Sequence, residues 1–173
     1  MNETINLLCE RRSVKSYKPE QVNEDLLQEA LKAATFAPTG RNSQSPTMVV
    51  VQNPEQIAQL SKMNAQLLGV DSDPFYGAPT VVVILANPEH STYLEDACLV
   101  AGNLMNACAA VGLGSCWIHR CRPMFESAEG KAILRSWGLS DQLIGVANII
   151  VGYQDAPAKP RVERKQDYIV RIK

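Results

Sequence analysis

The chain has 173 residues, a formal net charge of -1, 46% hydrophobic residues and 20% charged residues. This length suits one domain that buries most of its apolar surface without disulfides or metals, so we expect a single domain over residues 1–173. The near-neutral charge argues against a general attraction to nucleic acid or to an anionic membrane, and any cluster of cations is therefore a local feature.

The five cysteines are odd in number and include no Cys-x-x-Cys pair, which indicates free thiols in a reducing, cytoplasmic compartment. Cys116, His119 and Cys121 have a spacing that matches no zinc template, so we expect no metal. The longest apolar run, residues 81–86, is too short to cross a bilayer, and the first residues lack the basic and apolar parts of a secretion signal. We expect no membrane association.

The first predicted element is a short helix that begins near residues 2–4 and carries Ile5, Leu8 and Cys9 on one face. The stretch Arg-Arg-Ser-Val-Lys at residues 11–15 follows it. Cations at the end of a helix suit its dipole, which is a purely structural interpretation. Three cations and a hydroxyl within five residues also suit a phosphate, because guanidinium groups bind its oxygens in pairs.

A second helix follows the capping residue Asn23 and ends before Pro38. Its predicted buried stripe consists of Leu26, Leu27, Ala30, Leu31 and Ala34. The loop after it is rich in Thr, Gly, Asn and Ser, residues that permit unusual backbone conformations or bond to their own main chain. Such a loop is either an ordinary connection or a ligand site.

The middle of the chain alternates strands and helices. Residues 47–52 predict a strand, and Asn53-Pro54 starts a helix with apolar residues at Ile57, Leu60, Met63 and Leu67. The uniformly apolar strand at 81–86 indicates a position covered on both faces. Residues 94–111 form a helix of small side chains, which is either a central core helix or a subunit interface.

The last third predicts a strand at 115–119, one helix at 124–137 and a strand at 143–153. Prolines then forbid regular pairing, and a basic patch precedes an alternating stretch at 168–172. We expect residues 154–173 to be an extended tail lying on a surface. The patch consists of Lys159, Arg161, Arg164 and Lys165. Alternating elements by themselves suit a parallel α/β sheet as well as an α+β fold.

Five motifs in this order resemble the nitroreductase family: residues 11–15, 38–44, 75–79 before a central strand, 112–118, and the basic C-terminal segment. The resemblance implies an α+β fold of three layers, with a mostly antiparallel sheet of four or five strands between helices. It also implies an intertwined homodimer with two shared flavin mononucleotide (FMN) sites and a tail, 154–173, that packs on the partner subunit.

The resemblance also implies the cofactor-binding residues, and no catalytic side chain because the flavin carries the chemistry. Arg11, Arg12, Ser13, Arg164 and Lys165 hold the phosphate, and Lys15 lies near the pyrimidine edge of the ring. Pro38, Thr39, Gly40, Asn42 and Gln44 come from the turn that reaches the flavin of the other subunit. A backbone amide around Ile118 and His119 points at flavin N5, and Asn64 contacts the ring edge.

The function implied is an FMN-dependent oxidoreductase that transfers reducing equivalents from NADH or NADPH, with ping-pong kinetics, to nitroaromatics, quinones or similar small electrophiles. One alternative is a flavin-binding relative that performs reductive dehalogenation or flavin degradation. Another is a nucleotide-binding module without enzymatic activity. The basic residues lack interleaved aromatics, which argues against nucleic acid as a partner.

Two stretches depart from the family pattern. Ser45-Pro46-Thr47 follows Gln44, where many relatives have an aromatic residue. His119 and Arg120 stand where Gly-Gly or Glu-Gly is common. His119 is either an ordinary polar residue at a strand end or a side chain in the acceptor slot. Arg120 and Arg122 either face solvent or attract an anionic substrate.

Overall fold

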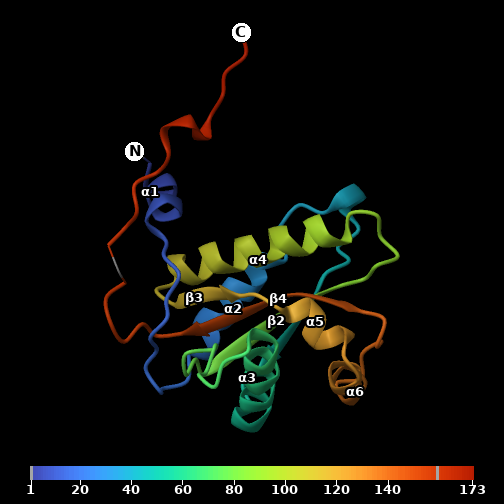
Figure 1. Ribbon diagram of the computed structural model, residues 1–173. Helices are drawn as coiled ribbons and strands as arrows, with labels where there is room; N and C mark the ends of the chain where they lie inside the picture. The colour runs from blue at the N-terminus through green and yellow to red at the C-terminus, as the bar shows by residue number, and fades with distance from the viewer. Residues whose placement is uncertain (1, 159) are drawn as a thin grey trace.

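The computed structural model describes residues 2–158 and 160–173, so Lys159 of the basic patch lies outside the described residues. Four strands form one sheet in the order β1-β2-β4-β3, and every neighbouring pair is antiparallel. Helices cover both faces (Figure 1). The predicted three-layer α+β fold is therefore confirmed. The strands are β1 (Thr47–Val51), β2 (Thr80–Ala86), β3 (Gly114–Ile118) and β4 (Ile144–Gly152).

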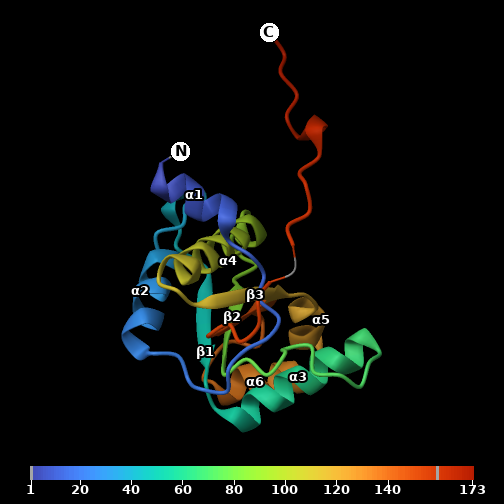
Figure 2. The same cartoon turned by 90° about the vertical axis from the view of Figure 1, so that its left-hand side faces the viewer.

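The two faces of the sheet belong to two separate hydrophobic clusters. Helices α2 (Glu24–Ala34) and α4 (Tyr93–Ala110) pack on one face, with Val82 and Ile84 of β2. Helices α3 (Pro54–Leu68), α5 (Cys121–Glu126) and α6 (Ala128–Ser136) pack on the other, with Val81 and Val83. Figure 2 shows these helices on opposite sides of the sheet.

Strand β2 is the centre of the fold, because all seven of its residues are buried. Successive side chains of a strand point to opposite faces, so β2 contributes to both clusters. Each fully buried Val or Ile side chain stabilises the fold by about 1.5–3 kcal/mol. The prediction that this strand is covered on both faces is confirmed.

Asparagine side chains cap the N-termini of three helices. Asn2 accepts a hydrogen bond of 3.2 Å from the amide of Ile5 at the start of α1 (Glu3–Glu10). Asn23 accepts from two amides of α2, and Asn53 accepts from the third residue of α3. These caps satisfy amide groups that have no partner within the helix. The start of each helix could therefore be predicted within a residue or two.

The prediction of one helix at 124–137 is wrong, because Ser127 is not helical and separates two helices, α5 and α6. The Ser127 hydroxyl donates to the carbonyl of Met124 at 2.6 Å and accepts from the amide of Gly130 at 3.0 Å. It therefore closes α5 and caps α6. A Cβ atom on Gly130 would lie 2.1 Å from the Met124 carbonyl oxygen, so only glycine permits this close approach of the two helices.

The C-terminal segment runs outward from the domain, away from the sheet (Figure 1). The alternating stretch at 168–172 forms no strand in the part of the chain that the structure describes, and Ile172 is 92% exposed. Helix α1 has no buried residue, and Ile5 and Leu8 are each 46% exposed. Among the described residues, no helix is long and apolar enough to cross a membrane.

Candidate functional site

Residues 11–18 form an extended segment fixed along the edge of the sheet. Ser13 makes a parallel bridge to Ser115 of β3, and the amide of Val14 donates to the Ser115 carbonyl at 3.0 Å. Further on, the amide of Lys18 donates to Tyr153 just beyond β4. Val14 is buried against the sheet, whereas its neighbours Ser13 and Lys15 are exposed. The segment therefore presents its polar side chains outward.

These polar side chains line a cavity of about 450 Å³ together with the C-terminal segment. Arg12 Nη2 donates to the carbonyl of Pro160 at 3.5 Å, a bond between residues 148 positions apart. The cavity thus gathers cations from both ends of the chain. The predicted site residues that line it are Arg11, Arg12, Ser13, Lys15 and Arg164. Lys165 does not line it, and its ammonium lies 3.7 Å from Asp167 on the surface.

Arg11, one of the residues that line this cavity, has an unsatisfied donor. Its Nη1 atom is buried and has no hydrogen-bond partner. Among the described residues, Arg11, Arg12, Lys15 and Arg164 form no ion pair with a carboxylate. A buried donor without an acceptor lowers stability, and charge-assisted bonds to phosphate oxygens satisfy such donors strongly. The residues present therefore fit a phosphate group.

Lys15 stands beside an aromatic residue that the sequence did not single out as functional. Its ammonium lies 5.8 Å from the centre of the Tyr76 ring. Tyr76 has a φ of 54°, a left-handed conformation that is strained for any residue other than glycine. Asp73 holds this turn by accepting hydrogen bonds from the amides of Phe75 and Gly77 and from the Ser61 hydroxyl. The Asp-Pro-Phe-Tyr-Gly sequence was the available signal for the turn.

At the other end of β3, the turn into α5 is held by Asn64 of α3. The Asn64 amide nitrogen donates to the His119 carbonyl at 2.7 Å, and its oxygen accepts from Arg120 Nε at 3.2 Å. Asn64 is completely buried. Asn64 thus holds the His119 carbonyl and the Arg120 side chain in this turn. The contact between Asn64 and the ring edge that the resemblance implies stays a prediction.

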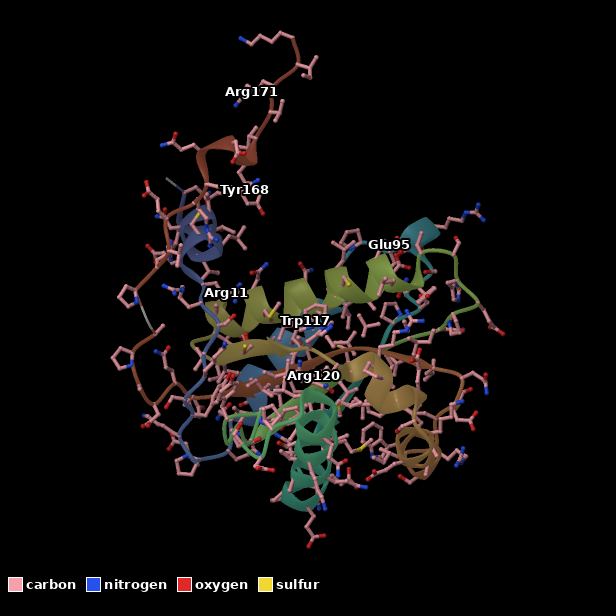
Figure 3. The ribbon with its side chains drawn as sticks, in the orientation of Figure 1. Arg11, Glu95, Trp117, Arg120, Tyr168 and Arg171 are labelled. Atoms are coloured by element: carbon pink, nitrogen blue, oxygen red, sulfur yellow. The ribbon has the colours of Figure 1, made fainter. Side chains whose placement is uncertain are left out.

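The two ends of β3 lie close enough for one ligand. The rise along a strand places Ile118 roughly 10 Å from Ser115, the residue beside Ser13. Figure 3 shows Arg11 beside α1 and Arg120 between β3 and α3. The cationic cavity and the Asn64-supported turn therefore border one stretch of the sheet edge.

The turn at residues 38–44 lies elsewhere in the protomer. The Gly40 amide donates to Asp96 near the start of α4, whereas α1, which Arg11 follows directly, lies near the opposite end of that helix (Figure 1). An 18-residue helix is roughly 27 Å long. One protomer therefore does not bring Pro38, Thr39, Gly40, Asn42 and Gln44 to the cationic cavity. Asp96 was not predicted as part of this turn, because its partners Gly40 and Ser43 lie more than 50 positions away in the chain.

The cysteines are free thiols, and burial raises the pKa of several of them. Cys116 lies under the cavity; burial raises its pKa, while a hydrogen bond with Ser13 and the charges of Lys15 and Arg11 oppose this. Burial raises the pKa of Cys108 to about 12. In the described part of the chain, no three His, Cys, Asp or Glu side chains gather as metal ligands.

The fold and the cavity define an α+β domain that can hold a phosphorylated ligand at the edge of an antiparallel sheet. The sequence model of the nitroreductase family, described as "Nitroreductase family", matches residues 8–72 and 66–153. The chain therefore belongs to the nitroreductase family, which confirms the resemblance seen in its motifs.

Similar proteins agree with this membership. A protein of Archaeoglobus fulgidus named "Putative NADH dehydrogenase/NAD(P)H nitroreductase" is 26% identical over 160 residues, which are 88% of this chain and 86% of that protein. A nitroreductase from Bacteroides fragilis, solved with bound FMN, has a TM-score of 0.91 at 22% identity over 100% of both chains. An FMN-dependent nitroreductase from Clostridium difficile R20291 has a TM-score of 0.87 at 25% identity over 99% of both chains.

Proposed function

We propose that this protein is an FMN-dependent oxidoreductase that takes electrons from NADH or NADPH and passes them to a nitroaromatic, a quinone or a similar electrophile. The observation that carries the proposal is the cavity that Arg11, Arg12, Ser13, Lys15 and Arg164 line together, where none of these cations is paired with a carboxylate among the described residues. Family membership and the FMN named for the Bacteroides and Clostridium relatives support the choice of ligand.

In this proposal the cationic cavity binds the FMN phosphate. Arg11 and Arg164 donate to its oxygens, and Ser13 adds a neutral donor at the sheet edge. Lys165 follows Arg164 directly. It would bind the phosphate as well once its ammonium leaves Asp167, its present ion-pair partner. Cys116 stays a neutral thiol because burial raises its pKa, so it adds no negative charge below the phosphate.

In this proposal Lys15 and the turn after β3 contact the isoalloxazine ring of FMN. Bound FMN supplies hydride acceptance and donation at N5. Lys15, held against Tyr76, places a positive charge where the reduced ring becomes negative. A backbone amide around Ile118 and His119, in the turn that Asn64 holds through the His119 carbonyl, would point toward flavin N5. Nicotinamide and acceptor use the same ring face in turn, which predicts ping-pong kinetics.

The site is completed by a homodimer. Residues 38–44 lie a helix length away from the cavity of their own chain, so in this proposal they reach the flavin of the partner subunit. Exposed apolar residues on α1 and on the tail supply the surface that such a dimer buries. The tail, 154–173, packs on the partner as an extension of the single domain. Sedimentation should give a dimer, and deletion of residues 160–173 should weaken both dimerisation and FMN binding.

An anaerobic titration tests the proposed activity. The purified protein is loaded with FMN, freed of excess FMN, and mixed with NADH or NADPH under nitrogen. The expected result is bleaching of the flavin absorbance by at least one nicotinamide, and recovery of the colour when a nitroaromatic or a quinone is added. A protein that binds no FMN contradicts the proposal. A bound flavin that neither nicotinamide reduces indicates a flavin-dependent reaction of another kind.

A further inference from the structure

Arg120 has a backbone conformation that favours glycine. Its φ is 74° and its ψ is 9°, in the left-handed region, at the position that precedes α5. A side chain with a Cβ atom is strained in this region, and strained residues tend to cluster at functional sites. The strained backbone at Arg120 therefore indicates that its side chain has a function.

The guanidinium of Arg120 is anchored at one edge only. Its Nε atom donates to Asn64 Oδ1 at 3.2 Å, and Asn64 is itself completely buried and bonded to the His119 carbonyl. In the described part of the chain, no carboxylate lies within ion-pair distance of Arg120. A guanidinium has five N–H donors, so most of its donors stay available for a ligand.

Arg122, two residues further on, shows the opposite arrangement. Its Nε atom lies 2.8 Å from Glu126 Oε1, and both side chains are more than half exposed. Its charge is thus neutralised on the outer surface of α5. Arg120 is half-buried and unneutralised, whereas Arg122 is exposed and paired. The two neighbouring arginines therefore provide a matched test and control.

The position of Arg120 relates it to the reacting edge of the site. It directly follows Ile118 and His119, around which a backbone amide points at flavin N5 in the proposed function, on which this inference rests. We propose that Arg120 determines acceptor specificity by binding a carboxylate, or another anionic group, of the electrophile while its reducible group lies over the flavin. A planar guanidinium held by Asn64 matches a carboxylate with two parallel hydrogen bonds.

The test compares two acceptors of similar shape, para-nitrobenzoate and para-nitrobenzamide, with the FMN-loaded enzyme. The first two-electron step turns the nitro group into a nitroso group and water, and converts one NADH or NADPH and one proton into NAD⁺ or NADP⁺ plus that water. The variants are Arg120→Gly, which suits the left-handed backbone, Arg120→Lys, which keeps the charge, and Arg122→Ala as control. Thermal melting verifies that all three fold.

A second measurement, independent of turnover, is the binding of redox-inert benzoate or benzamide to the oxidised enzyme. Changes in the flavin absorbance spectrum report this binding.

The wild-type enzyme should have the higher kcat/KM with para-nitrobenzoate and should bind benzoate more tightly than benzamide. In Arg120→Gly, kcat/KM for para-nitrobenzoate and the affinity for benzoate should each fall about tenfold, as expected for loss of one charge-assisted contact. The kcat/KM for para-nitrobenzamide and the affinity for benzamide should each fall less than twofold. Arg120→Lys should recover part of the loss, and Arg122→Ala should behave as wild type.

Four results would overturn the assignment. Equal losses on anionic and neutral compounds would mean that Arg120 acts on the flavin or on the turn. A changed ratio of NADPH to NADH use with unchanged acceptor selectivity would place its partner on the nicotinamide phosphate. Reduction of neither acceptor, while NADH or NADPH still bleaches the flavin, would reject the acceptor class but leave the oxidoreductase proposal intact. A protein that binds no FMN would reject both.

Discussion

The amide of Gly40 donates a hydrogen bond of 2.8 Å to Oδ1 of Asp96, a residue 56 positions later in the chain. Asp96 is 2% exposed and also accepts hydrogen bonds from the hydroxyls of Ser43 and Thr92. A Cβ atom at position 40 would lie 2.2 Å from Thr92 Oγ1, so glycine is needed for this contact. One buried carboxylate thus attaches the 38–44 turn to the start of α4.

We therefore expect Asp96→Ala to lower the free energy of unfolding by about 2–4 kcal/mol, because it leaves a backbone donor and two hydroxyls without their acceptor. Urea denaturation monitored by circular dichroism measures the change. Asp71→Ala, at an exposed loop position, should change the stability by less than about 0.5 kcal/mol. A loss in Asp96→Ala no larger than that of this control would show that the turn does not depend on Asp96.

Arg11→Gln should weaken FMN binding through the phosphate alone. Removal of a charge-assisted contact predicts a dissociation constant that rises about tenfold to a hundredfold. Riboflavin, which lacks the phosphate, should bind the variant and the wild type equally well. Quenching of flavin fluorescence measures both ligands. Arg135→Ala removes a cation that is paired with Asp141 on the surface and should affect neither ligand. Equal weakening of FMN and riboflavin would contradict a phosphate contact.

Asn64→Leu, a change of similar volume, should destabilise the protein by about 1–3 kcal/mol. It leaves the His119 carbonyl without its donor and releases Arg120. The exposed Gln66→Leu, two residues further along α3, is the control. Thermal and urea denaturation give the stabilities. If the two variants unfold alike, the Asn64 bonds do not hold the turn.

Cys108 should make the stability depend on pH in the alkaline range. Burial raises its pKa from 9.0 to about 12 in the folded protein. Below pH 9 the thiol is protonated in both states and has no effect. Above pH 9 the unfolded chain loses the proton while the folded chain keeps it, so the free energy of unfolding falls. The slope approaches about 1.4 kcal/mol per pH unit up to about pH 12.

Denaturation curves under reducing conditions at several pH values above and below 9 measure this slope. Cys108→Ala should reduce the slope relative to the wild type. Cys9→Ala, at an exposed position, should leave it unchanged. The same decline in Cys108→Ala as in the wild type would assign the effect to other groups, such as Tyr17, whose pKa burial also raises.

Part of the candidate site could be predicted from the sequence. Arg11, Arg12 and Arg164 were expected at one phosphate site with Lys15 near the ring, and these four cations line one cavity, whereas Lys165, also expected at the phosphate, does not line it. The local supports of this site were missed: Tyr76 beside Lys15, Asp73 in its turn, and Asp96 below the 38–44 turn. An aspartate whose partners lie in another element has no signal in its own neighbourhood.

The sequence by itself determined the elements that depend on neighbours in the chain. The Asn2, Asn23 and Asn53 caps act within three residues, and the apolar run at β2 is buried on both faces. These features are local, so residue type and spacing suffice to predict them.

Only the tertiary structure decided the strand order β1-β2-β4-β3, the break at Ser127 and the use of the Asn64 side chain. It also decided the distance between the 38–44 turn and the cavity of the same chain, which is set by the length and direction of α4. These features depend on contacts between residues far apart in sequence, where many pairings are compatible with the same local pattern. Packing selects among them because one arrangement buries both faces of β2.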